Sequence, residues 1–337
     1  MRTRVVDHQA HWYPPAYFES ILDRETPPMA RRVDADTYVY VDALGAEQVC
    51  PPTFHALDVH QADMDAHDVD VAVLSPNLVG DVSRLPLEDA VSTAELLNAE
   101  IGKAQRSQPN RIVGLAMLPL QDPDAAIEVL GHAIDDHDLA GVCFLSNIAG
   151  APIVKPELLP VYRELEQRNL PLFLHPAHSS VVDSVGYGPT INIGLGWMFE
   201  TAAAALSLVY GGVLDACPDL VVVHPHLGGA LPGVVDRVVE CEIAVELRYP
   251  LRTYLQRNFF VDTVQKTPGA PGLAVATYGL DRLVFGTDFP WIERKGSADA
   301  TRSALSPWQY EQVLANAIPN LRLPAAAVTG SGSAVAD

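Results

Sequence analysis

The chain has 337 residues, 48% hydrophobic and 19% charged, so it is long enough and apolar enough to bury a substantial core. Its 42 acidic and 22 basic residues give a formal net charge of −20, which repels nucleic acid and anionic membranes, and we expect neither partner. The chain shows no signal-peptide-like start, no apolar run near the ~20 residues of a membrane span and no paired cysteine spacing, which predicts a cytoplasmic protein with free thiols.

In chain order, short apolar runs of the kind found in buried parallel strands alternate with stretches of helical periodicity. One helix is expected from the N-cap and first-turn pair Asp122-Pro123, a second over 156–168 and a third over 198–214. Eight such strand–helix units favour an α/β fold, a distorted closed (β/α)8 TIM barrel, over an open doubly wound sheet. The eight predicted strands are 4–8, 69–75, 111–117, 139–145, 171–175, 220–225, 258–262 and 282–287.

Two segments depart from this alternation. Residues 13–57 hold Pro14-Pro15 and an alternating run at 33–41 that predicts a small hairpin, so we interpret them as an insertion after the first strand that covers the barrel mouth. Residues 325–337 are rich in Gly and Ser and predict a flexible tail. The expected organisation is therefore one barrel domain over 1–324, followed by the tail.

Polar residues of one chemical kind follow several predicted strands. His11 lies just past the first strand, His175 ends the fifth, His226 follows the sixth, and Asp288 follows the eighth. In an α/β barrel the carboxyl ends of all strands meet at one face, so these side chains should converge there. Histidine and aspartate are common ligands of zinc, and an incompletely liganded metal at such a face is typical of a catalytic site. The chain is therefore expected to be an enzyme.

Several motifs together make the chain resemble the amidohydrolase-2 family of metal-dependent barrel enzymes, typified by aminocarboxymuconate-semialdehyde decarboxylase and the resorcylate-type decarboxylases. The similarity extends over nearly the whole chain and is specific for the family but weak for the substrate. The motifs that support it are Trp12-Tyr13-Pro14-Pro15, Met64-Asp65, Leu118-Pro119-Leu120-Gln121-Asp122-Pro123, Leu174-His175-Pro176, Phe199-Glu200-Thr201, His226-Leu227-Gly228-Gly229 and Phe285-Gly286-Thr287-Asp288-Phe289-Pro290.

The resemblance implies roles for individual residues. His11, His175 and Asp288 match metal ligands, His226 matches the catalytic imidazole, and Asp288 also moves a proton. The family's first strand has a ligand pair His-x-His or Glu-x-His, and the first member of that pair falls here on Gln9. An amide oxygen is a poorer ligand than imidazole or carboxylate.

Three hypotheses follow from Gln9. A divalent metal, zinc or alternatively manganese, is retained with one weak ligand. His8 replaces Gln9 as the ligand on a bulged strand. In the third, the metal is lost and the His/Asp cluster serves acid–base chemistry or only ligand binding. His224, two positions before His226, is expected one layer deeper inside the barrel as a supporting residue.

The leading functional hypothesis is non-oxidative decarboxylation of an aromatic or unsaturated carboxylic acid, with hydrolysis or hydration of a lactone, amide or enol as the alternative. The resemblance also suggests a homodimer that acts on a small molecule. Aromatic side chains and one histidine beside the expected ligands are candidates for substrate binding: Trp12, Tyr13, His178, Phe289 and Trp291.

Overall fold

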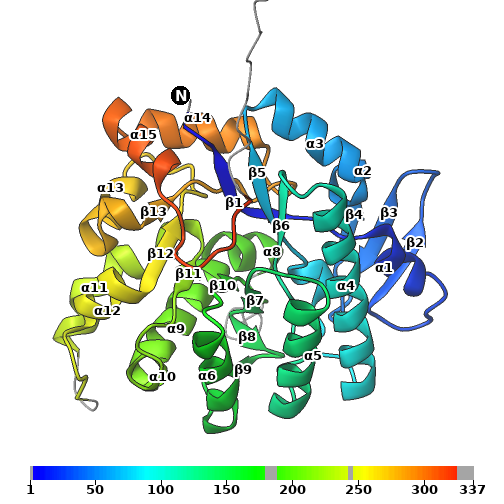
Figure 1. Ribbon diagram of the computed structural model, residues 1–337, viewed down its shortest axis with the longest axis horizontal. Helices are drawn as coiled ribbons and strands as arrows, with labels where there is room; N and C mark the ends of the chain where they lie inside the picture. Colours follow the sequence, from blue (N-terminus) through cyan, green and yellow to red (C-terminus); the bar gives the residue numbers. More distant parts are fainter. Residues whose placement is uncertain (1–2, 179–187, 242–245, 325–337) are drawn as a thin grey trace, which may run out of the picture.

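A closed ring of parallel strands forms the centre of the molecule in the computed structural model, which describes residues 3–178, 188–241 and 246–324 (Figure 1). The predicted tail, 325–337, lies outside the described residues. All eight predicted strand positions hold a strand. They are β1 (Val6–His11), β5 (Val71–Ser75), β6 (Ile112–Gly114), β7 (Val142–Leu145), β10 (Leu172–His175), β11 (Val222–His224), β12 (Phe259–Asp262) and β13 (Leu283–Val284).

Two parallel sheets make up the ring, one in the order β1-β5-β6 and one in the order β13-β12-β11-β10-β7. Parallel bridges join their edges, from Ala10 to Phe289 and from Ala116 to Val142. Each strand thus lies next to the strand that follows it in the barrel sequence, and the last returns to the first. This arrangement is the predicted (β/α)8 barrel.

Helices on the outside of the ring connect successive strands (Figure 1). Asp122 caps α5 as predicted, because its carboxylate accepts a hydrogen bond from the Ala125 N–H at 2.9 Å. The third predicted helix is divided at Gly212, whose φ of +76° ends the helical path. The larger connecting helices are α3 (Leu57–Ala66), α4 (Leu87–Ser107), α5 (Pro123–Asp135), α6 (Leu159–Gln167), α9 (Trp197–Tyr210), α10 (Val213–Ala216), α11 (Leu231–Glu240), α12 (Leu251–Asn258), α13 (Ala270–Tyr278), α14 (Arg294–Ala304) and α15 (Pro307–Ala315).

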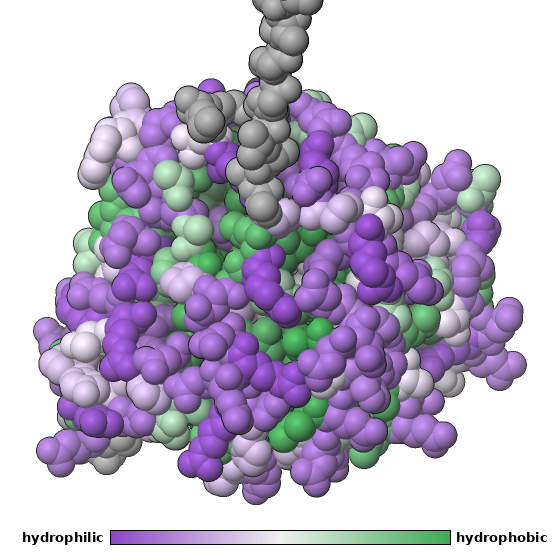
Figure 2. Space-filling model, viewed as in Figure 1, coloured by the Kyte–Doolittle hydropathy of each residue, from purple (hydrophilic) through white to green (hydrophobic). Residues whose placement is uncertain are grey.

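The core has two layers. Outward-facing strand residues pack against the helices, and a separate cluster fills the barrel below the strand ends. The face of the molecule in Figure 2 is mainly hydrophilic, with apolar residues visible in its depressions. The inner cluster shows which strand positions point inward: Val6, Val71, Val73, Val113, Leu115, Phe173, Val223, Phe260 and Val284.

The insertion is larger than the predicted hairpin. After α1 (Pro15–Ser20), β2 (Met29–Arg32), β3 (Tyr38–Val41) and β4 (Glu47–Cys50) form a three-stranded antiparallel sheet, and α2 (Pro52–His55) leads back to the barrel. The alternating run at 33–41 contains only one strand, because its first residues form the turn between β2 and β3. This small sheet lies to one side of the barrel in Figure 1. Asp42, in the β3–β4 turn, reaches His178 in the loop after β10, 2.8 Å from its Nε2.

One described helical stretch, Pro189–Tyr210, is long and apolar enough to cross a membrane by length and composition alone, contrary to our expectation for the sequence. It includes α8 (Pro189–Ile191), η3 (Asn192–Gly196) and α9. In the fold, α9 is the crossover between β10 and β11, and its buried residues, such as Ala205 and Leu208, belong to the core between the helices and strands. That packing accounts for only part of the apolar composition, because 39% of the apolar 18-residue window in this stretch is buried and large apolar side chains such as Leu195 and Phe199 are exposed.

Candidate functional site

Three of the predicted metal ligands converge at the C-terminal end of the barrel. His11 ends β1, His175 ends β10, and Asp288 follows β13, and one possible ligand atom from each lies within 4.8 Å of the others. All three residues are buried. A cavity of about 10 Å³, the space of one small occupant, is lined by His11, His175, Gln9 and Asp262 among others. The donor set, two imidazoles and one carboxylate, fits a divalent cation.

Hydrogen bonds at Nδ1 orient both histidine rings so that the Nε2 of each is directed at the cluster. His11 Nδ1 lies 2.9 Å from Ser75 Oγ, and its Nε2 lies 2.9 Å from Asp288 Oδ1. The Ser75 hydroxyl donates or accepts, so it suits either tautomer of His11. His175 Nδ1 lies 2.8 Å from the Pro176 carbonyl, which can only accept, so Nε2 keeps its lone pair. Such outer contacts fix the ring orientation of metal-binding histidines.

Burial and neighbouring charges set the protonation of the cluster. Burial, together with the positive charge of His11, lowers the pKa of His175 to about 3, so the ring is neutral, the form that binds metals. Burial raises the pKa of Asp288, but hydrogen bonds from His11 and His226 and the charges of both rings outweigh it and hold the pKa below its ordinary value. Asp288 is therefore an ionised carboxylate that can bind a cation.

A bulge in β1 decides the position of the unusual Gln9. Asp7 pairs with Ala72 and Ala10 with Leu74, so β1 has one residue more than β5 between these two pairs. As a result His8 and Gln9 both line the interior cavity. His8 Nδ1 lies 3.1 Å from the Phe285 carbonyl, and His8 is not part of the three-residue cluster. The predicted bulge is present, yet Gln9 is the residue that reaches Asp288.

The Gln9 amide lies between two carboxylates. One of its terminal atoms is 3.5 Å from Asp288 Oδ1, and the other faces Asp262. The hydrogen-bond network assigns the NH2 group to the Asp262 side, where it donates to Oδ1 at 3.1 Å and also to Oδ2. The amide oxygen then faces Asp288. Gly286 makes this contact possible, because a Cβ there would lie 2.9 Å from the Asp262 Cβ and 3.2 Å from the Gln9 Cβ.

Asp262 itself is fully buried at the end of β12. Its Oδ1 accepts hydrogen bonds from the His226 N–H at 2.9 Å and the Val264 N–H at 3.0 Å. Burial raises its pKa to about 7, although the positive charge of His226 acts in the opposite direction. The residue thus connects the backbone at His226 with the side chain of Gln9.

His226 lies at the edge of the cluster, with its Nε2 3.5 Å from Asp288 Oδ2. Burial lowers its pKa, but the hydrogen bond and negative charge of Asp288, with the charge of Asp262, raise it above the ordinary value. Its Nδ1 has no hydrogen-bond partner among the described residues. A histidine with a raised pKa beside the ligand cluster is suited to donate a proton to a bound molecule.

His224 does not lie inside the barrel, so that expectation was wrong. Val223 belongs to the inner cluster, and His224 on the opposite side of β11 lies 3.2 Å from the Tyr278 hydroxyl of α13. The strand ends at His224, and His226 begins a 3-10 turn with a φ of +56°. The alternation of a strand therefore does not relate the two histidines.

The predicted substrate-binding residues have different surroundings. Trp12 donates from Nε1 to the His55 carbonyl at 2.8 Å, and His178 is paired with Asp42. Phe289 packs between the Arg294 guanidinium, 4.2 Å from its ring, and the His60 ring. Tyr13 and Trp291 lie in a hydrogen-bond chain that leads to the cluster: Trp291 Nε1 donates to the Tyr13 hydroxyl at 2.9 Å, and this hydroxyl donates to Asn77.

Sequence reasoning missed three polar residues of the site: Ser75, Asn77 and Asp262. Asn77 Nδ2 donates to His175 Nε2 at 2.8 Å. The signal was available, because Ser75 and Asp262 end predicted strands and Asn77 follows one, which is the rule that selected the histidines.

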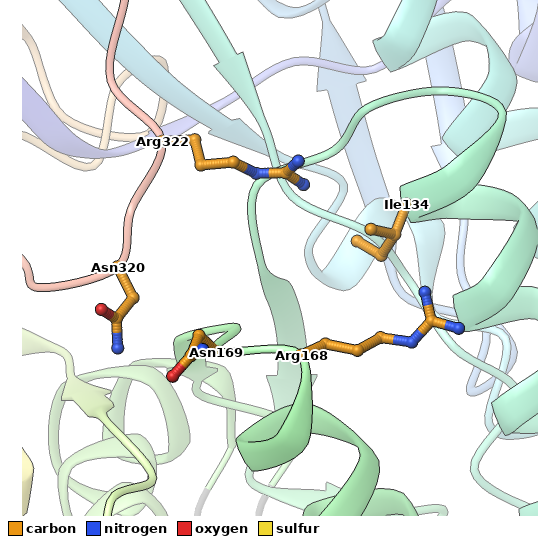
Figure 3. A pocket seen from close by; sticks show the side chains of 5 residues that line it. All are labelled: Ile134, Arg168, Asn169, Asn320 and Arg322. Atoms are coloured by element: carbon orange, nitrogen blue, oxygen red, sulfur yellow. The ribbon is translucent and has the colours of Figure 1, made fainter.

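A larger cavity, of about 420 Å³, lies at the other end of the barrel (Figure 3). Asn169, which precedes β10, lines it together with two arginines, but both of these already have carboxylate partners. Arg168 binds Asp135 at 2.9 Å, and Arg322 binds Asp138 at 2.9 Å. This cavity is a shallow structural depression without free charge for an anion.

Comparison with known proteins agrees with the geometry. The sequence model of the family described as Amidohydrolase matches residues 6–314. The chain is 32% identical over 245 residues to a gamma-resorcylate decarboxylase of Rhizobium radiobacter, covering 68% of this chain and 75% of that protein. It is 29% identical over 248 residues to a 2-amino-3-carboxymuconate-6-semialdehyde decarboxylase of Dictyostelium discoideum, covering 69% of this chain and 66% of that protein.

Solved structures share the fold. The IDCase of Metarhizium anisopliae superposes with a TM-score of 0.84 at 25% identity, over 95% of this chain and 97% of that one. A dihydroxybenzoic acid decarboxylase of Polaromonas sp. JS666, solved with bound manganese and the inhibitor 2-nitroresorcinol, gives a TM-score of 0.74 at 20% identity, over 93% and 94% of the two chains.

Proposed function

The chain belongs to the amidohydrolase family, and from this premise we propose that it is a metal-dependent enzyme that decarboxylates an aromatic or unsaturated carboxylic acid without oxidation. The observation that supports this most is the joint placement of His11, His175 and Asp288 with His226 beside them. A cation site next to a histidine that can donate a proton is what replacement of a carboxyl group by a proton requires.

The chemistry assigns a task to each residue. His11, His175 and Asp288 would hold a divalent metal, which supplies positive charge to bind and polarise substrate oxygens. The His226–Asp288 pair holds the proton that is added to the carbon bearing the carboxylate. In the first step, a π electron pair of the substrate forms the new C–H bond at that carbon. The bond to the carboxylate then breaks, its electrons restore the π system, and CO2 leaves. His226 regains a proton from solvent.

We further propose that Gln9 is a fourth, neutral ligand. Asp262 binds the amide NH2 and so directs the amide oxygen toward Asp288 and the cluster. In this way a side chain that is intrinsically a weak ligand is held in one orientation before the metal binds, which reduces the entropy lost on binding. Two imidazoles, one carboxylate and one amide oxygen suit zinc best, with manganese as the alternative.

The test combines metal analysis with two assays. Protein purified without chelator is analysed for metal, and carbon dioxide release and ring opening are measured on a panel of hydroxybenzoates and lactones. We expect bound metal, CO2 release from a hydroxybenzoate, loss of that activity after chelation and its return with zinc or manganese. Ring opening alone would identify a hydrolase instead. Metal-free protein that is fully active and gains nothing from either metal would contradict the metal proposal. Cytoplasmic location and a homodimer remain predictions from sequence.

A further inference from the structure

The side-chain amide of Asn77 donates a hydrogen bond to the nitrogen lone pair of His175, a candidate metal ligand. Asn77 follows β5, is fully buried, and donates from Nδ2 to His175 Nε2 at 2.8 Å. The opposite ring nitrogen of His175 donates to the Pro176 carbonyl at 2.8 Å, so Nε2 is an acceptor and not a donor. The nitrogen that His175 would offer to a metal therefore already has an amide N–H attached to it.

The Asn77 side chain cannot turn over to present its oxygen instead. Its Oδ1 accepts a hydrogen bond from the buried Tyr13 hydroxyl, which in turn accepts one from Trp291 Nε1 at 2.9 Å. The three residues come from the ends of three different strands, since Tyr13 follows β1, Asn77 follows β5 and Trp291 follows β13. Tertiary structure thus fixes the amide with its NH2 directed at the cluster.

Coordination by His175 would use the lone pair that now accepts from Asn77. The Asn77 N–H groups would then be buried without an acceptor, which is unfavourable, while still directed at the metal position. An oxygen of a molecule bound beside the metal would satisfy them. We propose that Asn77 is a substrate-positioning residue whose amide passes from the His175 lone pair to a carboxylate or hydroxyl oxygen of the substrate. This inference rests on the proposed function.

Two consequences separate this role from a structural one. Removing the amide removes a competitor for the His175 lone pair, so metal affinity should be kept or increased. The same change removes a donor for the substrate, so binding of a carboxylate ligand to the metal-loaded protein should weaken. A residue that only supports the fold would, when removed, weaken both or neither.

The experiment compares wild type with Asn77→Leu and Asn77→Asp. Mn²⁺ affinity is measured by chelator competition with the electron paramagnetic resonance signal of free Mn²⁺. Binding of 2,6-dihydroxybenzoate to the Mn²⁺-loaded proteins is measured by calorimetry, with the other hydroxybenzoates of the panel used if it does not bind wild type. Asn147→Leu is the matched control, since Asn147 is also a buried amide after a strand end, but its NH2 binds the His178 carbonyl at 3.0 Å and Glu200 at 3.1 Å.

For Asn77→Leu we expect Mn²⁺ affinity equal to wild type or up to about tenfold tighter, and hydroxybenzoate affinity about 10–100-fold weaker. Asn77→Asp keeps the size of the side chain and its Tyr13 partner. Its negative charge should weaken hydroxybenzoate binding at least as much as Asn77→Leu does, so this variant provides the test if Asn77→Leu does not fold. Asn147→Leu should change neither value by more than a few fold. Hydroxybenzoate affinity equal to wild type in both Asn77 variants, or a Mn²⁺ affinity lost in Asn77→Leu, would overturn the inference.

Failure of the proposed function gives a different result. In that case wild type itself binds no Mn²⁺ at the cluster or no hydroxybenzoate in its presence, whichever residue stands at position 77. If wild type and the Asn77 variants all bind Mn²⁺ and hydroxybenzoate equally well, the decarboxylase proposal stands and only the role of Asn77 is refuted.

Discussion

The carboxylate of Asp7 accepts hydrogen bonds from both the backbone N–H of Thr287, at 3.0 Å, and its hydroxyl, at 2.6 Å. Asp7 lies on the outer side of β1, and Thr287 directly precedes Asp288. The contact therefore attaches the segment that positions Asp288 to β1, the strand that positions His11. The Asp288 N–H also donates to the Gln9 carbonyl at 2.8 Å. Asp288, with a φ of +61°, is held in a conformation that is uncommon for a side-chain-bearing residue.

Arg294 compensates the buried charge of Asp7. It is 1% exposed, donates from Nε to Asp7 Oδ2 at 3.1 Å and also binds Asp63. Arg294→Met should lower the free energy of unfolding by about 3–5 kcal/mol, because it leaves a buried carboxylate without its cation. The control is Arg31→Met, which breaks the exposed pair with Glu47 and should cost less than about 1 kcal/mol. Urea denaturation measures both, and similar costs for the two variants would contradict this account.

The contact between Gln9 and Asp262 predicts how the first-strand ligand can be strengthened. Gln9→Glu alone places two buried carboxylates against each other, so one must take up a proton, and the gain in metal affinity is limited. In the double variant Gln9→Glu with Asp262→Asn, that repulsion is absent. We expect Mn²⁺ affinity on the order of 10–100-fold above wild type for the double variant and a smaller gain for the single one. Chelator competition gives both values, and an equal gain in the two would show that Asp262 does not interact with position 9.

Position 226 offers a test of proton transfer with an internal control. His226→Asn should keep the fold and the metal but reduce turnover by roughly 10²–10⁴-fold, as for loss of a general acid–base group. His224→Asn changes a histidine two positions earlier that faces Tyr278 outside the barrel, and turnover should stay within about tenfold of wild type. Metal content and steady-state rates are compared for both. Loss of metal in His226→Asn would make His226 a ligand.

Buried neutral histidines predict that stability falls in acid. Burial, together with the charge of Arg294, lowers the pKa of His60 in α3 to about 3. Between about pH 3 and the unfolded value near 6.5, the unfolded chain binds this proton and the folded chain does not. The contribution of neutral His60 is therefore full above pH 6.5 and is lost as the pH falls, by up to ~1.4 kcal/mol per pH unit.

His60→Leu should accordingly reduce the difference in unfolding free energy between pH 5 and pH 7.5. The control is exposed His132, whose pKa the hydrogen bond and charge of Glu95 raise. Its contribution is present at low pH and lost as the pH rises, so His132→Gln should shift the same difference slightly in the opposite direction. Urea titrations at the two pH values measure both effects. An unchanged pH difference in His60→Leu would show that His60 is already protonated in the folded protein or is exposed.

The barrel and most of the metal cluster follow from patterns that are local in the chain. Strands such as Leu172–His175 are local runs of apolar residues, and their ends can be located without knowing their neighbours. Once the runs are counted as strand–helix units, barrel topology brings every strand end to one face. This is why His11, His175 and Asp288 could be expected to meet, although they are far apart in the chain.

The contacts among these strand ends depend on how distant segments of the chain pack together. The extra residue in β1 is defined by pairing with β5, so whether His8 or Gln9 reaches Asp288 depends on register between strands and not on local sequence. His224 faces outward, opposite Val223 on β11, and because the strand ends at His224 the alternation does not extend to His226, from which the position of His224 was inferred. The amides of Gln9 and Asn77 are oriented by Asp262 and by Tyr13, from other strands. Hydrogen bonds between distant segments form only when packing brings their atoms within about 3 Å, a condition that no local pattern encodes.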